Sequence, residues 1–267
     1  MNFKKLFKVS KPIIGMVHVD ALPGTPKYKG DKNNIINKAI DEAKMYLDAG
    51  INSIAIENMH DVPYLNRKVG PEIISMLSII AYEVKNRTNL PIGLQILAGA
   101  NKEALACAKS AGIDFIRVEG FVFAHVADEG FINSDAGELL RYRKIIDAEN
   151  ILIFTDIKKK HSSHNLTADV SIEETAKAAE FFLSDGLILT GASTGKEADV
   201  NEIKAVKKVS KLPVIIGSGI TEKNVENYLP FCNAMIVGSY FKREGNWENM
   251  VDGKRVKSFM KKVNTII

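Results

Sequence analysis

The sequence has few cysteines, no long apolar run and no large excess of one charge. Its two cysteines, Cys107 and Cys232, lie among small and apolar neighbours, which indicates buried thiols in a reducing compartment and no disulfide framework. No apolar stretch approaches the roughly 20 residues of a membrane-spanning helix, and the lysine-rich residues 1–11 lack the apolar core of a signal peptide. We therefore expect a cytoplasmic protein with no membrane partner.

The formal net charge of +4 is small and spread along the chain, so the composition does not support a nucleic-acid partner. Hydrophobic residues make up 46% and charged residues 25% of the sequence, as in ordinary globular proteins. The length of 267 residues suits a single (β/α)8 barrel domain over residues 1–267, because no linker or low-complexity tract divides the chain. The sequence leaves open whether the protein forms a homo-oligomer.

Short apolar runs rich in β-branched residues alternate with patterns of helical periodicity along the chain. The runs that predict strands are residues 13–19, 53–57, 92–97, 114–119, 151–156, 186–190, 214–216 and 234–237. Helical patterns follow them at about residues 34–49, 70–87, 102–111, 135–148, 171 onward, 199–210, near 221 and 252–266. Strand–helix units in one register predict a parallel sheet with right-handed crossovers.

A doubly wound open sheet is the alternative arrangement of such units. It would need a glycine-rich fingerprint after the first strand, and Pro23-Gly24-Thr25-Pro26 does not supply one. We therefore predict an α/β fold of the (β/α)8 TIM-barrel type. The short lead-in with Phe3, Leu6 and Phe7 is expected to plug the bottom of the barrel.

The last two predicted strands each end in glycine followed by a small polar residue. Gly217, Ser218 and Gly219 follow the seventh strand, and Gly238 and Ser239 follow the eighth. Glycine lets the backbone turn sharply and bring N–H groups to an anion. Because the loops after strands seven and eight of a barrel converge on one point, these five residues predict a phosphate site and a phosphorylated small-molecule ligand.

Polar and charged side chains gather at the carboxyl ends of the predicted strands, which form the catalytic face of a barrel. The residues predicted to carry catalysis are His18, Glu57, Glu119, Asp156 and Lys158. Those predicted to contact the substrate are Asn58, Gln95, Arg117, Lys160 and Thr190. A carboxylate base, with a histidine or lysine that polarises a carbonyl oxygen, suits proton abstraction from carbon.

Side chains alternate across the fifth strand, so Asp156 and Lys158 are expected to face the barrel mouth together. The pair could position a substrate or a metal, whereas a desolvated Lys158 could form a Schiff base, as in an aldolase. Lys159 is interpreted as a solvated residue of a basic loop. Glu57 and Glu119 could face each other across the mouth, as base and partner or as metal ligands.

His161 and His164 are weak candidates for metal ligands, since their spacing fits one helical turn but loop histidines more often bond to backbone groups. No cofactor is firmly implied, and a divalent metal is left open. The long loop around Asp128 predicts a lid over the site. Residues 190–196 predict either a second oxyanion-binding wall or a flexible loop.

Several short motifs are spread along nearly the whole chain. They are Ile14-Gly15-Met16-Val17-His18 with Leu22-Pro23-Gly24-Thr25-Pro26, Glu57-Asn58 with Asp61 and Pro63, Phe115-Ile116-Arg117-Val118, Asp128-Glu129-Gly130, Leu140-Arg141-Tyr142-Arg143, Lys160-His161-Ser162, Thr190-Gly191 with Thr194-Gly195, Gly217-Ser218-Gly219, and Ile236-Val237-Gly238-Ser239 with Lys242. In these motifs the sequence resembles the BtpA family.

The resemblance implies a barrel of the ribulose-phosphate-binding kind. The family takes its name from a photosystem I biogenesis factor, some members carry phosphoribosylanthranilate-isomerase-like labels, and its bacterial relatives look like sugar-metabolism proteins. Members often have an Arg-Asn-Asp run after the third strand. This sequence has Ala98-Gly99-Ala100-Asn101 there, so the contacts of that run are not carried over.

Three functions follow as hypotheses. The first is an isomerase or lyase that acts on a sugar phosphate or a similar phosphorylated metabolite. The second is a non-catalytic assembly or stabilisation factor, which would present an apolar surface patch. The third is a metal-dependent hydrolase, which would hold a cation with two or three of His18, Glu57, Asp156 and His161.

Overall fold

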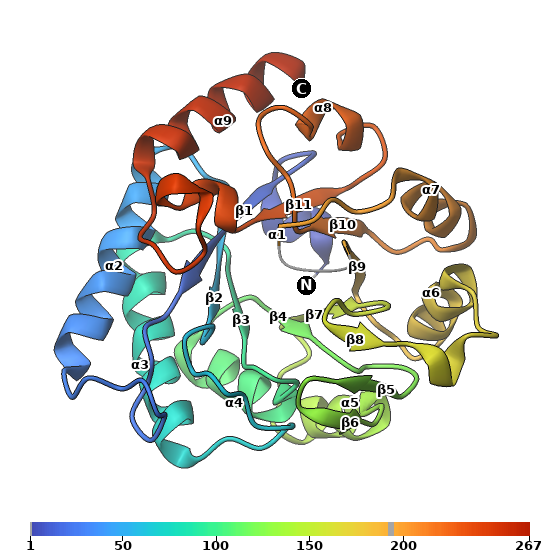
Figure 1. Cartoon of the computed structure of the whole chain (residues 1–267), viewed down its shortest axis with the longest axis horizontal. Helices are drawn as coiled ribbons and strands as arrows, with labels where there is room; N and C mark the ends of the chain where they lie inside the picture. Colours follow the sequence, from blue (N-terminus) through green and yellow to red (C-terminus); the bar gives the residue numbers. More distant parts are fainter. Residues whose placement is uncertain (1, 192–194) are drawn as a thin grey trace.

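Eight parallel strands close into a barrel in the computed structural model of the chain, which describes residues 2–191 and 195–267 (Figure 1). Round the barrel, the order is β1-β11-β10-β9-β7-β4-β3-β2. These strands are β1 (Ile13–His18), β2 (Ser53–Glu57), β3 (Ile92–Gln95), β4 (Phe115–Val118), β7 (Leu152–Asp156), β9 (Gly186–Thr190), β10 (Val214–Gly217) and β11 (Ala234–Val237). The predicted (β/α)8 fold is confirmed.

Helices other than the short amino-terminal one surround the barrel and cover the outer faces of its strands (Figure 1). The helices of the described residues are α1 (Phe3–Phe7), α2 (Lys32–Asp48), α3 (Pro71–Thr88), α4 (Asn101–Ala111), α5 (Ala136–Ile145), α6 (Ile172–Phe181), α7 (Val200–Val209), α8 (Val225–Tyr228) and α9 (Gly253–Ile266). Short 3-10 turns are η1 (Asn165–Thr167), η2 (Ser239–Phe241) and η3 (Arg243–Gly245). Ser171 and Glu174 form a capping box at the start of α6.

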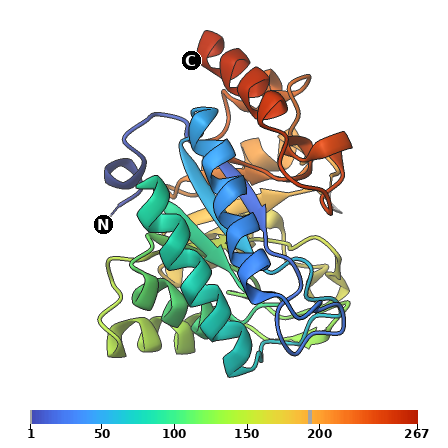
Figure 2. The ribbon, with the colours of Figure 1, turned by 90° about the vertical axis from the view of Figure 1, so that its left-hand side faces the viewer.

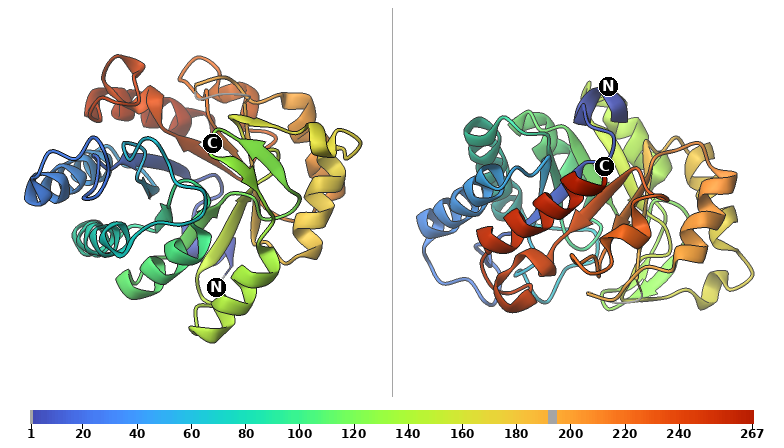
Figure 3. Two further views of the ribbon diagram at one scale, coloured as in Figure 1. Left: turned by 60° about the horizontal axis from the view of Figure 1, so that its bottom comes forward. Right: turned by 90° about the horizontal axis from the view of Figure 1, so that it is seen from above.

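The amino-terminal helix α1 closes one end of the barrel, as its apolar face predicted. Phe3 and Phe7 pack on Phe154, with ring centroids 6.0 and 6.3 Å apart, and Phe7 also meets Phe115 at 5.9 Å. Leu6 belongs to the same buried cluster. Figures 2 and 3 show α1 at the end of the barrel away from the loops that follow the strands, so the site has only the other end available.

The strand register brings the predicted site residues to one level at the open end. His18 is paired with Glu57 across β1 and β2, and Arg117 with Phe154 across β4 and β7. Gly217 is paired with Thr190 on one side and with Ile236 on the other. Because β10 and β11 are neighbours, the two glycine-ended tips lie side by side.

Two segments differ from the sequence-based expectation. The long loop after β4 contains a hairpin of β5 (His125–Ala127) and β6 (Gly130–Ile132), and β5 also pairs with β8 (Ser162–Ser163) from the loop after β7. The helix expected near residue 221 is a single turn, α8, which starts at Val225. A turn of this length provides no helix dipole of consequence for an anion.

Candidate functional site

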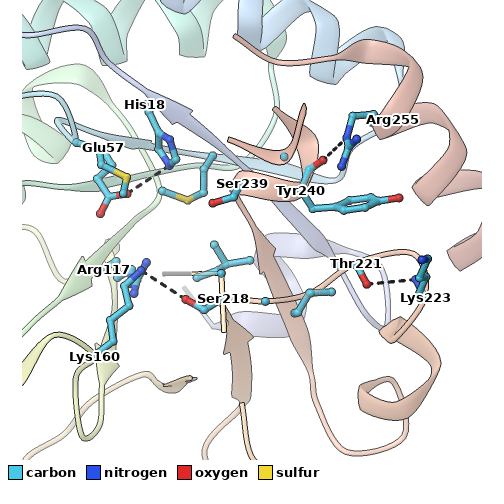
Figure 4. Close-up of a pocket in the computed structure, with 18 residues that line it drawn as sticks. His18, Glu57, Arg117, Lys160, Ser218, Thr221, Lys223, Ser239, Tyr240 and Arg255 are labelled. Carbon is cyan, nitrogen blue, oxygen red and sulfur yellow. Dashed lines mark hydrogen bonds and ion pairs between the residues drawn. The ribbon is translucent and has the colours of Figure 1, made fainter. Parts of the chain in front are cut away.

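A cavity of about 570 Å³ opens at the carboxyl ends of β10 and β11 (Figure 4). Four of the five predicted phosphate-site residues line it, and Gly217 ends β10 directly behind them. The other lining residues include His18, Glu57, Arg117, Lys160, Lys223, Tyr240 and Arg255. The cavity therefore joins the glycine-ended tips to side chains from the opposite wall.

The first tip has a backbone that needs glycine. Ser218 and Gly219 both have left-handed φ angles, of 69° and 65°. A Cβ atom on Gly219 would lie 2.4 Å from the carbonyl carbon of Lys196 and 2.5 Å from the backbone nitrogen of Glu197, too close for any side chain. The amide of Thr221 already donates to Asn224 Oδ1 at 2.7 Å. Because the Thr221 amide already has an acceptor, an anion would be bound by the residues of the tip and not by Thr221.

The second tip faces His18. A Cβ atom on Gly238 would lie 3.6 Å from His18 Nε2 and 3.5 Å from Met16 Cγ, so the absence of a side chain keeps space open in front of the imidazole. Behind this tip, the fully buried Lys242 pairs with Glu42 of α2 at 2.8 Å, and Glu42 also accepts from the Val251 amide at 3.0 Å. This buried ion pair fixes the segment after β11 to the outer helix α2.

His18 and Glu57 form a close pair at the inner end of the cavity. His18 Nδ1 lies 3.1 Å from the carbonyl oxygen of Trp247. Because a carbonyl can only accept, Nδ1 carries the proton and Nε2 presents a lone pair, 3.7 Å from Glu57 Oε2. Burial first, and the charge of Lys242 next, lower the pKa of His18 well below its usual value. The imidazole is therefore neutral near pH 7 and able to accept a proton.

Two cations line the wall between β4 and β7. Arg117 makes a bidentate pair with the buried Asp156, at 2.7 and 2.9 Å. Burial disfavours the charged guanidinium, but Asp156 outweighs it and raises the pKa of Arg117. Lys160 Nζ lies 3.4 Å from Ser218 Oγ, and burial followed by the charge of Arg117 lowers the pKa of Lys160. Asp156 itself does not line the cavity, and it holds Arg117 at the cavity wall.

Glu119 and Gln95 belong to a different, closed cluster. Gln95 Nε2 donates to Glu119 Oε1 at 2.9 Å. Lys159 lies 3.1 Å from Glu119 Oε2 and 3.6 Å from Oε2 of Glu129, which comes from the β5–β6 hairpin. The expectation of a solvated Lys159 is wrong: the residue is 8% exposed, and these two carboxylates overcome burial and raise its pKa. Burial raises the pKa of Glu119 despite Lys159.

Three further predicted residues lie outside the cavity. Lys158 has a left-handed φ of 50° and donates to the Val170 carbonyl at 2.8 Å, so it does not face the mouth with Asp156. Asn58 is braced between Asp61 and the Leu97 amide, both at 2.8 Å. Thr190 is half-buried beside Gly217, and its hydroxyl has no hydrogen-bond partner among the described residues. Residues 192–194 of the loop that follows lie outside the described part.

The histidines considered as metal ligands do not converge. His161 is exposed, and His164 Nε2 bonds to the backbone carbonyl of Lys159 at 2.9 Å. Within residues 2–191 and 195–267, no group of three histidine, cysteine or acidic residues is arranged to hold a metal ion. Among these residues, the hypothesis of a metal-dependent hydrolase therefore has no three-residue ligand set to support it, and of its named ligands only His18 and Glu57 lie close together, at 3.7 Å.

Sequence reasoning missed several residues around the cavity. Trp247, which sets the tautomer of His18, lies between His18 and His60, at ring-centroid distances of 6.3 and 5.0 Å. Tyr240 and Arg255 line the outer wall. The available sequence signal was that Trp247 is the single tryptophan of the chain. Nothing in the residues around it predicted a contact with His18.

Comparisons with known proteins agree with this architecture. A solved structure of (S)-3-O-geranylgeranylglyceryl phosphate synthase from Thermoplasma acidophilum, in complex with its substrate sn-glycerol-1-phosphate, superposes with a TM-score of 0.61. Its sequence identity is 14%, over 98% of this chain and 96% of that one, so the likeness concerns the fold.

Relatives match this chain in sequence over nearly its whole length. An uncharacterized protein of Caenorhabditis elegans, named as mitochondrial, is 50% identical over 98% of this chain and 96% of its own. Because this relative is named as mitochondrial, the expected cytoplasmic location of this protein remains a prediction. The photosystem I biogenesis protein BtpA of Synechocystis is 32% identical over 97% of this chain and 90% of its own. In the described parts of this chain, no helix has the length and apolar character to cross a membrane. The sequence model of the BtpA family matches residues 9–265, and the chain belongs to the BtpA family.

Proposed function

We propose that this protein is an enzyme that acts on a phosphorylated small metabolite, as an isomerase or a lyase. The observation that carries the proposal is a single cavity that contains both the paired glycine-ended tips and a neutral histidine beside a carboxylate. One set of groups suits an anion and the other suits proton transfer. A ligand that fills the cavity would meet both.

The phosphate is assigned to Ser218, Gly219, Gly238 and Ser239, with Gly217 behind them. Lys160, which lies 3.4 Å from the Ser218 hydroxyl, would add a positive charge on the inner side. The substrate named in the solved synthase structure, sn-glycerol-1-phosphate, is also a phosphorylated small molecule, which supports this assignment by analogy of fold alone.

His18 and Glu57 are proposed to move the proton. His18 Nε2 would take a proton from a carbon next to a carbonyl, and Glu57, 3.7 Å away, would stabilise the imidazolium that forms. Arg117 and Lys160 would stabilise the negative charge that develops on the carbonyl oxygen. Lys160 also replaces Lys158 as the candidate for a Schiff base, because it is the lysine that lines the cavity.

The proposal is tested in two steps. A thermal-shift screen against sugar phosphates and other phosphorylated metabolites should find ligands that raise the Tm by mass action. Each hit is then incubated with the protein in D₂O, where an isomerase or lyase of this kind should exchange a carbon-bound proton, observed by NMR. Ligands that bind but show neither turnover nor exchange would contradict the enzymatic proposal.

A second candidate function is a non-catalytic assembly factor, as the name of the cyanobacterial relative suggests. The observation that favours it is an apolar run at the end of α6, where Phe181, Phe182 and Leu183 are 81%, 45% and 69% exposed. A triple F181S/F182S/L183S variant should lose partner binding under this hypothesis and keep the activity under the first.

A further inference from the structure

The two glycine-ended tips stand in the middle of the cavity and not at its end. Figure 4 shows Ser218 and Ser239 between two groups of side chains, with His18 and Glu57 on one side and Tyr240, Arg255, Thr221 and Lys223 on the other. A phosphate monoester with its phosphate at the tips and its carbon atoms near His18 would leave the second side empty. The inference below rests on the proposed function and specifies its substrate class.

The far side of the cavity, called here the outer compartment, is lined by Ile220, Thr221, Lys223, Tyr240, Gly245 and Arg255. It contains two basic side chains. Across residues 2–191 and 195–267, neither Lys223 nor Arg255 is paired with a carboxylate within 4.0 Å. Arg117, Lys159 and Lys242 differ in this respect, since each of them is paired with an acid.

Arg255 is held so that its terminal nitrogens remain at the cavity wall. Its Nε donates to the Tyr240 carbonyl at 2.6 Å, and its guanidinium carbon lies 4.6 Å from the centre of the Tyr240 ring. Its Nη2 lies 3.6 Å from the position of a Cβ atom on Gly245, another lining residue. A guanidinium oriented in this way suits the oxygens of a phosphoryl group.

The same contact argues against an aromatic base in the outer compartment. A face of Tyr240 on which a base could stack is covered by the guanidinium of Arg255. The hydroxyl of Tyr240 donates to Glu222, which does not line the cavity and which also accepts from Ser258. The compartment is therefore suited to an anion.

We propose that the ligand of this site is a diphosphate ester. Its inner phosphoryl group lies at the two tips, its second phosphoryl group lies between Arg255 and Lys223, and its organic group extends toward His18 and Glu57. The cavity of about 570 Å³ falls in the usual range for small-molecule sites, roughly 300–1,000 Å³, and has room for the whole of such a ligand.

The test compares inorganic pyrophosphate with inorganic phosphate by isothermal titration calorimetry, in EDTA so that magnesium complexes do not contribute. Pyrophosphate should bind at least about tenfold more tightly, because the second group adds charge-assisted hydrogen bonds. R255Q and K223Q should each reduce this ratio, and the double variant should bring it near one. K261Q removes one charge from the exposed side of the same helix, α9, and should leave the ratio unchanged.

R255K separates a binding role from a structural one, because it keeps the charge and should retain part of the preference even if the Tyr240 contacts are lost. Equal affinities for the two anions in the wild type, or a ratio that R255Q and K223Q leave unchanged, would overturn the diphosphate assignment. If S218A and S239A weaken the binding of phosphate, the proposed function still stands even when the diphosphate assignment fails. Failure of both anions to bind would count against the phosphate site itself.

Discussion

The mouth of the barrel has two halves that are built from similar residues and differ in their charge pairing. The open half borders the cavity and comprises His18, Glu57, Arg117 and Lys160. The closed half lies over β3 and β4 and comprises Gln95, Glu119, Lys159 and Glu129. In the closed half a lysine is shared by two buried carboxylates. In the open half Arg117 is paired with Asp156, and a neutral imidazole and a lysine of lowered pKa line the cavity.

This difference separates two uses of ionisable residues at strand ends. A buried charge is tolerated when an opposite charge and hydrogen bonds satisfy it. In the closed half Lys159 supplies the opposite charge, although Gln95 Oε1, Glu119 Oε2 and Glu129 Oε2 have no hydrogen-bond partner among the described residues. The open half directs its polar groups at the cavity, which is the arrangement expected at a ligand site. We therefore propose that the closed half has a scaffolding role and that the open half carries the chemistry.

The largest expected effect is on catalysis in the open half. With a substrate from the screen, E57Q and H18Q should each lower kcat by about 10²- to 10⁴-fold, the usual contribution of general acid–base groups, while the Tm changes little. K158Q, which alters a lysine outside the cavity, is the matched control and should keep nearly full activity. Loss of activity in K158Q together with full activity in E57Q would reverse the assignment of the two residues.

The second effect is on stability, and it compares two adjacent lysines. K159M should lower the free energy of unfolding by about 3–5 kcal/mol, because Glu119 is left as a buried carboxylate without its partner. K160M removes a charge from the open half and should change it by no more than about 1 kcal/mol. Urea unfolding of both variants measures the difference.

Adding E119Q to K159M should recover part of the loss, since the second change removes the unpaired charge. Equal destabilisation by K159M and K160M would show that the two halves do not differ in the way described.

The fold and the phosphate tips could be predicted from local sequence, whereas the two halves could not. Apolar periodicity predicts the strands and helices, and neighbouring glycine-ended strands are a local signal whose meeting point follows from barrel topology. The pairing of Lys159 depends on Glu129, which approaches from a hairpin about thirty residues earlier in the chain.

The misassignment of Lys158 has a simple backbone cause. The alternation of side chains holds only within a strand, and β7 ends at Asp156. The left-handed φ of 50° at Lys158 then turns its side chain toward Val170, and Lys160 takes the place in the cavity. A one-dimensional pattern does not contain the angle at which the chain leaves the sheet.

The third effect separates the two tips. G219A places a Cβ atom 2.4–2.5 Å from backbone atoms of Lys196 and Glu197 at a left-handed φ, so it should cost about 1–3 kcal/mol of stability as well as phosphate affinity. G238A meets only His18 and Met16 side chains, at 3.5–3.7 Å, and should weaken ligand binding with little change in stability. Calorimetry measures the phosphate affinity of each variant, and a thermal melt measures its stability. An unchanged melt in G219A would refute the requirement for glycine at that tip.

The smallest effect is a pH dependence in the hairpin that covers the closed half. Burial first, then the charges of Lys159, His164 and Arg67, lower the pKa of His125 to about 4, with Asp156 acting in the opposite direction. The unfolded chain, where histidine titrates near 6.5, binds the extra proton from about pH 6.5 downward, and the folded protein does so only near pH 4. Stability from His125 is therefore present above pH 6.5 and lost as the pH falls through this window, by about 1 kcal/mol per pH unit.

H125Q should flatten the slope of unfolding free energy against pH between 6 and 5. Parallel curves for the wild type and the variant would exclude His125 as the source of that slope.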